Sequence, residues 1–162
     1  MKLYTILENL STPLADREIT GVTDNTKNVK DGMIFVCVAG KNFDGHSAAE
    51  EMLKQGAALV ICAHDLGLGD RQIVVKNTRQ VYGDLCAAWY GHPEREMDFI
   101  GVTGTNGKTT TATLLKEMLK RAGHKVGLIG TVQYEIGEEI LPSPNTTPLT
   151  DSYFSLLRKM AD

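Results

Sequence analysis

The residues best suited to chemistry in this sequence stand in one short stretch, GVTGTNGKTTT at residues 101–111. Glycines let a backbone turn tightly and bring its amide groups to phosphate oxygens. In such loops a lysine reaches the β- and γ-phosphates, and the hydroxyl after it is a ligand for Mg²⁺. Gly107, Lys108 and Thr109 have these types in this order, although Val102 replaces the glycine usual five positions before Gly107. The stretch therefore predicts a nucleotide-phosphate site.

The segments on either side of this loop favour a phosphate site over a chance cluster of glycines and threonines. Residues 99–102 predict a strand that leads into the turn, and residues 108–123 predict a helix that follows it at once. Such a helix would point its free amide groups and positive dipole end at the anion. Its apolar side would carry Leu114, Leu115, Met118 and Leu119. A GTP switch is not supported, because the NKxD motif is absent and the only DxxG precedes the loop.

The remaining pattern predicts an α/β fold in two units. Apolar, β-branched runs alternate with helix-forming segments before residue 95, which is typical of a mostly parallel sheet. We expect strands at 33–40, 57–63 and 72–76, and helices at 46–56, ended by Gly56, and at 77–91, capped by Asn77.

The polar stretch HPEREMD at 92–98 is the candidate linker between these units. After it we expect strands at 125–130 and 131–137, a loop at 141–151 and a last helix from residue 151. A P-loop domain normally needs more strands than these. The expected organisation is a small N-terminal α/β domain at 1–95 followed by the truncated start of a P-loop (Rossmann-like) ATP-binding domain at 96–162.

The composition excludes several classes of function. With a formal net charge of −3 and no basic block, nucleic acid is not the expected partner. No apolar run reaches the length of a membrane span, and the N-terminus does not resemble a signal peptide. Cys37, Cys62 and Cys86 lie far apart in apolar contexts, which indicates reduced core residues and no structural zinc. We expect a cytoplasmic monomer without membrane or nucleic-acid partners.

Two further groups of residues have no predicted role in chemistry. The four histidines, His46, His64, His92 and His124, stand at the ends of predicted elements and are interpreted as surface or capping groups. Glu135, Glu138 and Glu139 are interpreted as a solvated acidic patch.

At TGTNGKTTT (103–111) the sequence resembles the ATP loop of the Mur ligases, the ATP-dependent amide ligases of peptidoglycan synthesis, in which the displaced glycine is normal. Residues 23–46 resemble the opening segment of that family, where an Asp-Ser-Arg triplet precedes a strand and then an Asp-Gly pair. The triplet here reads Asn25-Thr26-Lys27, so its carboxylate is missing. PNTTP at 144–148 is similar to the family's Asn-Thr-Thr segment. The combination is most similar to the member that adds the third amino acid to UDP-N-acetylmuramoyl-L-alanyl-D-glutamate.

The resemblance implies a set of site residues and two cofactors, ATP and Mg²⁺. Lys108 would act as the catalytic cation and Thr109 as the metal ligand. The residues that match the ATP loop are Gly104, Thr105, Asn106, Gly107, Lys108, Thr109 and Thr110. Those that match contacts to the UDP part of the substrate are Asp24, Thr26, Lys41, Asn42 and Phe43. Those that match substrate contacts from the central domain are Asn145, Thr146 and Thr147.

The implied reaction transfers the γ-phosphoryl group of ATP to a substrate carboxylate, and the amine of lysine or meso-diaminopimelate then attacks the acyl phosphate. Such a ligase serves cell-wall biogenesis and, through it, cell shape and division. We expect these 162 residues alone to be inactive, because the family's magnesium-binding glutamate, modified lysine and amino-acid-binding domain match nothing here. The alternatives are the D-Ala-D-Ala-adding Mur ligase, a folylpolyglutamate-synthase-like ligase and a P-loop NTP-binding regulator that ligates nothing.

Overall fold

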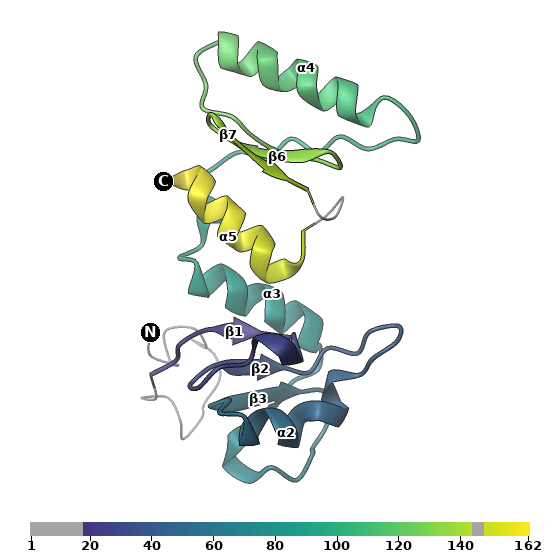
Figure 1. Cartoon of the computed structure of the whole chain (residues 1–162), viewed down its shortest axis with the longest axis vertical. Coiled ribbons are helices and arrows are strands. Elements are labelled where there is room, and N and C mark those ends of the chain that lie inside the picture. Colours follow the sequence, from purple (N-terminus) through teal and green to yellow (C-terminus); the bar gives the residue numbers. More distant parts are fainter. Residues whose placement is uncertain (1–17, 144–147) are drawn as a thin grey trace. The chain divides into compact units, whose positions relative to one another are not determined.

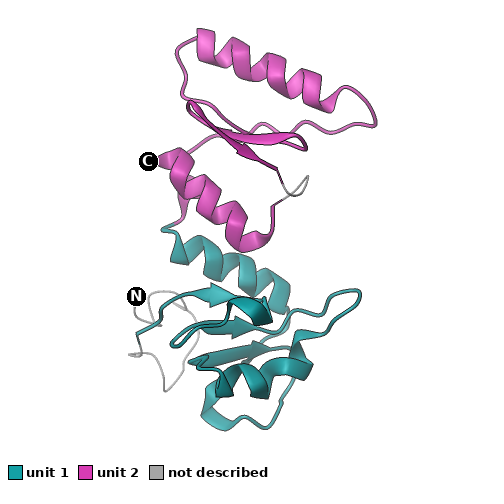
Figure 2. Ribbon diagram, viewed as in Figure 1, with its two compact units in different colours: residues 1–91 teal, residues 92–162 magenta. Residues whose placement is uncertain are grey.

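A computed structural model describes residues 18–143 and 148–162, and Figure 1 shows the arrangement of their elements. The chain divides into two compact units, residues 1–91 (unit 1) and 92–162 (unit 2), which Figure 2 colours separately. The sequence pattern placed this boundary after residue 95. Within the described ranges, no helix is both long enough and apolar enough to cross a membrane. Asn145, Thr146 and Thr147 lie outside the described residues.

Unit 1 is built on a parallel sheet of four strands in the order β1-β2-β3-β4. Each strand pairs with its neighbour in parallel. The strands are β1 (Val22–Thr23), β2 (Ile34–Val36), β3 (Leu59–Cys62) and β4 (Gln72–Val74). The three strands expected in this region are confirmed, each shorter than its predicted run, and β1 was not predicted. Every residue of β2 and β3 is buried, which explains why both read as continuous apolar runs.

Helices cover both faces of this sheet, as Figure 1 shows. The 3-10 turn η2 (Gly45–Ala48) leads into α2 (Ala49–Lys54) on one face, and α3 (Thr78–Trp89) lies on the other. Side chains alternate along a strand, so β2 and β3 contribute to the apolar core on each face of the sheet. The core on the α2 side contains Phe35, Cys37, Ala48, Ala49, Met52, Ala57, Val60 and Cys62.

The predictions about cysteines and helix ends are confirmed in unit 1. Cys37, Cys62 and Cys86 are buried and form no disulfide, and burial raises the pKa of the Cys37 thiol to about 12, which makes it unreactive. The side chain of Asn77 caps α3 by accepting a hydrogen bond from the Gln80 amide at 3.1 Å.

Unit 2 combines α4 (Lys108–Arg121) and α5 (Thr150–Ala161) with a three-stranded antiparallel sheet. Its strands are β5 (Gly127–Ile129), β6 (Gln133–Ile136) and β7 (Glu139–Pro142). Ile136 pairs with Glu139, so Gly137 and Glu138 form the tight turn between β6 and β7, and Gly137 has a φ of 59°. Residues 141–142 were wrongly assigned to a loop. The glycine at 137 was the signal for this hairpin.

The strand predicted at 99–102 is wrong, because those residues form no strand. Phe99 and Ile100 are 53% and 63% exposed. A strand forms only by pairing with a neighbour, and the described strands of unit 2 pair antiparallel with one another. An irregular segment therefore leads into the phosphate loop.

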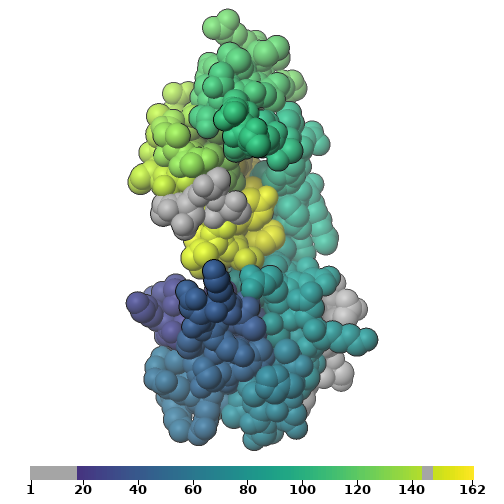
Figure 3. All heavy atoms as spheres, turned by 90° about the vertical axis from the view of Figure 1, so that its right-hand side faces the viewer, coloured from purple at the N-terminus to yellow at the C-terminus, as the bar shows by residue number. Residues whose placement is uncertain are grey.

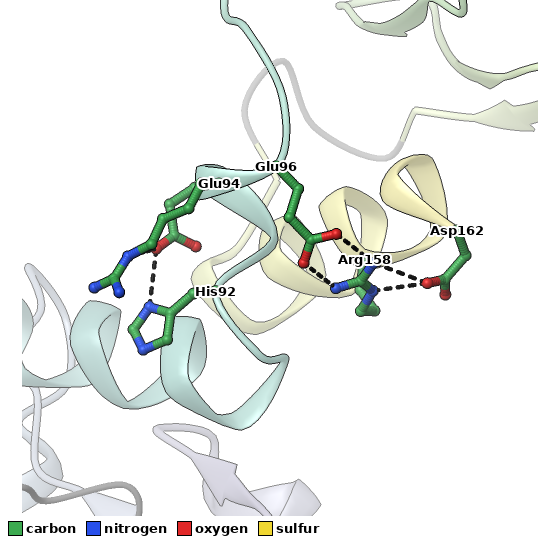
Figure 4. Close-up of polar contacts among 6 residues, drawn as sticks. His92, Glu94, Glu96, Arg158 and Asp162 are labelled. Atoms are coloured by element: carbon green, nitrogen blue, oxygen red, sulfur yellow. Dashed lines mark hydrogen bonds and ion pairs between the residues drawn. The ribbon is translucent and has the colours of Figure 1, made fainter.

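Glu96, which precedes this irregular segment, is anchored to α5 by an ion pair, shown in Figure 4. Arg158 donates to both carboxylate oxygens of Glu96, at 2.8 and 3.2 Å, and also contacts Asp162 at the end of α5. The hydrogen bonds from Arg158 hold the pKa of Glu96 below its usual value. Just before, the 3-10 turn η4 (Pro93–Arg95) follows His92, which has a φ of 58° and places Nδ1 2.9 Å from Glu94.

The apolar face predicted for α4 is only partly covered, because Leu115 and Leu119 are half-buried and the helix also makes a buried ion pair. Leu114 and Met118, expected in the core, are 59% and 66% exposed, while Lys116 is buried. Lys116 Nζ donates to Glu135 Oε2 on β6 at 2.8 Å. The prediction of a solvated acidic patch is therefore wrong for Glu135. Helix periodicity gives several candidate faces, and only the neighbouring sheet decides which one is covered.

We predict that Gly56→Ala destabilises unit 1 by about 1–2 kcal/mol, since a φ of +113° is a left-handed conformation that a side chain strains. The new Cβ would also lie 3.1 Å from the Cα of Asp31. Urea unfolding followed by circular dichroism measures the loss. Gly83→Ala is the matched control: it lies within α3 with nothing within 4 Å, and should stabilise the chain by up to about 1 kcal/mol. An unchanged midpoint for Gly56→Ala would contradict the prediction.

We predict that Glu135→Gln loosens unit 2 in a pH-dependent way. Hydrogen bonds from Lys116 and Gln133 lower the pKa of Glu135, so its contribution to stability is present above its ordinary value of 4.5 and disappears as the pH falls through the folded-state pKa. The same pair raises the pKa of Lys116, so that contribution persists until strongly alkaline pH.

The stability difference between the original chain and Glu135→Gln should therefore be large at neutral pH and shrink in acid, measured by thermal unfolding at a series of pH values. Glu138→Gln, on the exposed turn beside β6, is the control and should leave unfolding unchanged. Equal sensitivity of both variants would show that the ion pair does not hold α4.

Candidate functional site

The predicted phosphate loop is an exposed turn that leads directly into α4. Gly104 and Gly107 have φ values of 151° and 77°, so both use conformations that favour glycine. Gly107 is also the N-cap of α4, and without a side chain it leaves the first turn of the helix uncovered. The first amide groups of a helix have no carbonyl partner within it. These amides are therefore available to an anion at the loop.

Lys108 folds back across this loop. Its Nζ donates to the carbonyl oxygens of Gly104 at 2.7 Å and Thr105 at 3.4 Å. The ammonium group thus stands over the turn, where phosphate oxygens would compete with two backbone carbonyls for it. Asn106, Thr109 and Thr110 are exposed. All seven residues of the predicted ATP loop therefore lie in one accessible turn and the first turn of α4.

A divalent cation at Thr109 would depend on its nucleotide for further ligands. Within the described parts of the chain, no group of three or more histidine, cysteine, aspartate or glutamate side chains is arranged to hold a metal. A hydroxyl group is a suitable ligand for Mg²⁺, which usually keeps several waters and binds substrate phosphates. The chemistry of Thr109, next to Lys108 and the free helix amides, fits a Mg²⁺–nucleotide complex.

In unit 1 the predicted substrate residues follow two neighbouring strands. Asp24 and Thr26 come directly after β1, while Lys41, Asn42 and Phe43 belong to the loop after β2. Because β1 and β2 pair in parallel, both loops leave the same edge of the sheet. Ligands of open parallel sheets bind outside this carboxyl edge. The structure thus brings these five residues to one edge of unit 1.

The loop after β1 is ordered by the residue that replaces the family's acid. The Asn25 side chain accepts from the Lys27 amide at 3.0 Å and caps the 3-10 turn η1 (Thr26–Asn28). The backbone amide of Asn25 donates to the Thr23 hydroxyl at 3.1 Å. Asp24 and Thr26 are half-buried. The side-chain amide of Asn25 can therefore cap this turn in place of the missing carboxylate.

The loop after β2 forms a tight turn at its tip. Gly40 donates its amide to the Phe43 carbonyl at 2.9 Å, and Ala39 pairs with Asp44 in an antiparallel bridge at the base. Lys41 and Asn42 are exposed, and Phe43 is 52% exposed. Figure 3 shows the segment around residue 40 (blue) at the surface of unit 1. A cation, an amide and an aromatic ring therefore face solvent on one turn.

Two residues at the same edge were missed as site candidates. Arg79, in the first turn of α3 after β4, donates from Nη2 to the Ala39 carbonyl at 3.0 Å. His46, interpreted from sequence as a surface or capping group, accepts from the Ala63 amide after β3. Their positions in the first helical turns that follow β2 and β4 were the available signal, but the contacts to Ala63 and Ala39 join segments far apart in the chain.

Comparison with known protein families gives two matches along the chain. Residues 18–90 match the family described as "Mur ligase family, catalytic domain", and residues 102–162 match "Mur ligase middle domain". The second match begins at Val102, just before the glycine turn that leads into α4.

Curated relatives cover nearly all of this chain. It is 35% identical over 159 residues to the UDP-N-acetylmuramoyl-L-alanyl-D-glutamate–2,6-diaminopimelate ligase of Bacillus velezensis, covering 98% of this chain and 32% of the relative. It is 38% identical over 169 residues to the ligase of that name from Parabacteroides distasonis, covering 100% of this chain and 35% of the relative. The chain therefore spans about a third of the length of the curated relatives it matches.

A solved structure of a protein of that name has the same fold, with a TM-score of 0.78 at 23% identity over 99% of this chain and 33% of its own. Crystal structure I of MurF from Acinetobacter baumannii matches with a TM-score of 0.58 at 19% identity, covering 98% of this chain and 32% of its own. The expected α/β class with a parallel sheet is confirmed. With two family matches in the expected order and relatives above 30% identity across its length, the chain belongs to the Mur ligase family.

Proposed function

We propose that this chain is the first part of an ATP-dependent ligase that joins a diamino acid to UDP-N-acetylmuramoyl-L-alanyl-D-glutamate in peptidoglycan synthesis. The observation that carries this proposal is the glycine turn of residues 104–110, which presents a lysine and the free amides of α4 to an anion. The names of the relatives support the reaction and favour 2,6-diaminopimelate over lysine. The same names favour a diamino-acid-adding ligase over a D-Ala-D-Ala-adding ligase, a folylpolyglutamate-synthase-like ligase or an NTP-binding regulator.

The loop in unit 2 would bind the triphosphate of ATP. Lys108 would exchange the carbonyls of Gly104 and Thr105 for phosphate oxygens, and the α4 amides would bind the same anion. A Mg²⁺ ion at Thr109, when bound, would neutralise further negative charge. The γ-phosphoryl group passes from ATP to the substrate carboxylate and ADP is left. The amine then attacks the resulting acyl phosphate, and phosphate leaves with formation of the amide. Lys108 contributes by stabilising the charge of the transferring group.

The edge of unit 1 would bind the UDP part of the substrate. Thr26, Lys41 and Asn42 offer hydrogen-bond donors that a pyrophosphate or a uracil can use, and Asp24 offers an acceptor. The exposed ring of Phe43 offers an apolar face to the base or ribose. We further propose that Asn145, Thr146 and Thr147 contact the substrate from the central domain.

The reaction is proposed for a protein of the relatives' length, and the 162 residues alone are expected to bind without ligating. The protein would act as a monomer, and its substrates would be its only partners. We place it in the cytoplasm, since the reaction uses ATP and the three buried cysteines are not in disulfides.

We predict that Lys108→Ala weakens binding of a non-hydrolysable ATP analogue with Mg²⁺ by about 10- to 100-fold, because a hydrogen bond to a charged group is worth about 1.5–3 kcal/mol. Isothermal titration calorimetry on the 162-residue chain measures this. Lys125→Ala removes an exposed lysine from the same unit and should bind as the original chain does. Equal affinities for the two variants would reject Lys108 as a phosphate ligand.

We predict that Phe43→Ala weakens UDP binding by about two- to twelvefold, because aromatic contacts contribute about 0.5–1.5 kcal/mol beyond burial of area. Phe99→Ala is the matched control, since Phe99 is 53% exposed against 52% for Phe43 but lies in unit 2. Fluorescence-detected competition with a labelled uridine nucleotide would report both affinities. UDP binding that depends on Phe99 and not on Phe43 would place the uridine site elsewhere.

A further inference from the structure

The turn that carries Lys41, Asn42 and Phe43 is exposed, and its own contacts give it little reason to hold one conformation. Its tip is closed by a single backbone hydrogen bond, from Gly40 to Phe43 at 2.9 Å. Ordering a mobile loop when a ligand binds costs affinity, so binding loops gain from being ordered beforehand. Two side chains hold the base of this turn, one on each of its two sides: His46, two residues past Asp44, and Arg79 from α3.

His46 holds the side that ends at Asp44. The side chain of His46 is 8% exposed, and Nδ1 lies 2.5 Å from Asp44 Oδ1. Nε2 lies 2.9 Å from the amide of Ala63, which can only donate. Nε2 is therefore the acceptor, so Nδ1 carries the proton and donates to the carboxylate. One neutral tautomer thus links the end of β3 to the residue that closes the turn.

Asp44 is fixed by more than this ring. Its Oδ1 also accepts from the His46 amide at 3.0 Å, and its carbonyl accepts from the Ser47 hydroxyl at 2.7 Å. The hydrogen bonds from His46 hold the pKa of Asp44 below its usual value. On the outer side, the ring of His64 stacks on His46 with centroids 4.8 Å apart and planes 19° apart. The Asp44 side of the turn is therefore tied to the segment after β3.

Arg79 holds the other side of the turn. Its Nη2 donates to the Ala39 carbonyl at 3.0 Å, and Ala39 is the residue that pairs with Asp44 in the bridge. Arg79 lies in the first turn of α3, forty positions away in the sequence. Asp44 is thus tied through His46 to the segment after β3, and Ala39 is held by Arg79 from the segment after β4.

We propose that His46 and Arg79 are positioning residues that order the Lys41–Phe43 turn for the UDP part of the substrate. The proposal rests on the proposed function, because it takes this turn to be the uridine-nucleotide site. Neither residue needs to touch the ligand: each acts on the backbone or carboxylate that closes the turn. A residue that only stabilised the fold would lower the melting temperature without changing the affinity of the folded chain for UDP.

Calorimetric titration of the 162-residue chain with UDP, and separately with an ATP analogue and Mg²⁺, tests the proposal. We expect His46→Ala and Arg79→Gln each to weaken UDP binding by about three- to tenfold, the range that a lost hydrogen bond of about 1 kcal/mol gives, and to leave ATP-analogue binding unchanged. Arg79→Lys, which keeps a donor, and His46→Gln, whose amide oxygen can accept from Ala63, should each recover part of the affinity. His124→Ala and Arg121→Gln, exposed in unit 2, are the matched controls.

Amide hydrogen exchange at Gly40 gives a second measurement that needs no ligand. The Gly40 amide is bonded to the Phe43 carbonyl, so it should exchange several-fold faster in His46→Ala and Arg79→Gln. If His46→Ala does not fold, Arg79→Gln decides the test, because it alters only an exposed side chain.

The outcomes separate this inference from the proposed function. UDP binding by the original chain with unchanged affinity in the folded variants would overturn the positioning role and leave the uridine site in place. No UDP binding by the original chain would count against the uridine site itself. The Gly40 exchange rates would then judge the two contacts alone, and unchanged rates would show that they do not order the turn.

Discussion

Parallel pairing of β1 to β4 is the constraint on which unit 1 depends. Parallel strands send all their carboxyl ends to one edge of the sheet, so the segments after four separate strands meet there. Such a sheet needs cover on both faces, which α2 and α3 supply. The burial of β2 and β3 that results fixes the register of the sheet, and with it the positions of Thr26, the Lys41–Phe43 turn, His46 and Arg79.

Unit 2 meets a different demand, because a phosphate loop requires free amides. Gly107 begins α4 without a side chain, and the lysine after it is held by carbonyls that a phosphate can displace. A helix that presents its N-terminus in this way must be held elsewhere along its length. Here the contacts include the ion pair between Lys116 and Glu135, whose directional hydrogen bond restricts the rotation of the helix more narrowly than an apolar contact would.

Sequence reasoning was most accurate where the structure is set locally. The glycines at 104 and 107, the Asn77 cap and the stop at Gly56 are all decided by the conformational preferences of single residues, and all were read from the sequence. It failed where a partner distant in the sequence decides. The segment 99–102 has the composition of a strand but no strand to pair with, and α4 turns Leu114 outward because β6 offers a carboxylate to Lys116.

The sequence by itself determined the α/β class, the strands of unit 1 other than β1, the buried thiols and the glycine turn at 104–107 that leads into α4. These depend on local patterning, which hydrophobic alternation and glycine conformation control over a few residues. Only the tertiary structure decided that His46 reaches the Ala63 amide, that Arg79 reaches the Ala39 carbonyl at the base of the turn, and that Glu135 is buried. Those contacts join residues 17, 40 and 19 positions from their partners, a separation at which side-chain chemistry gives no information until the sheet has brought the segments together.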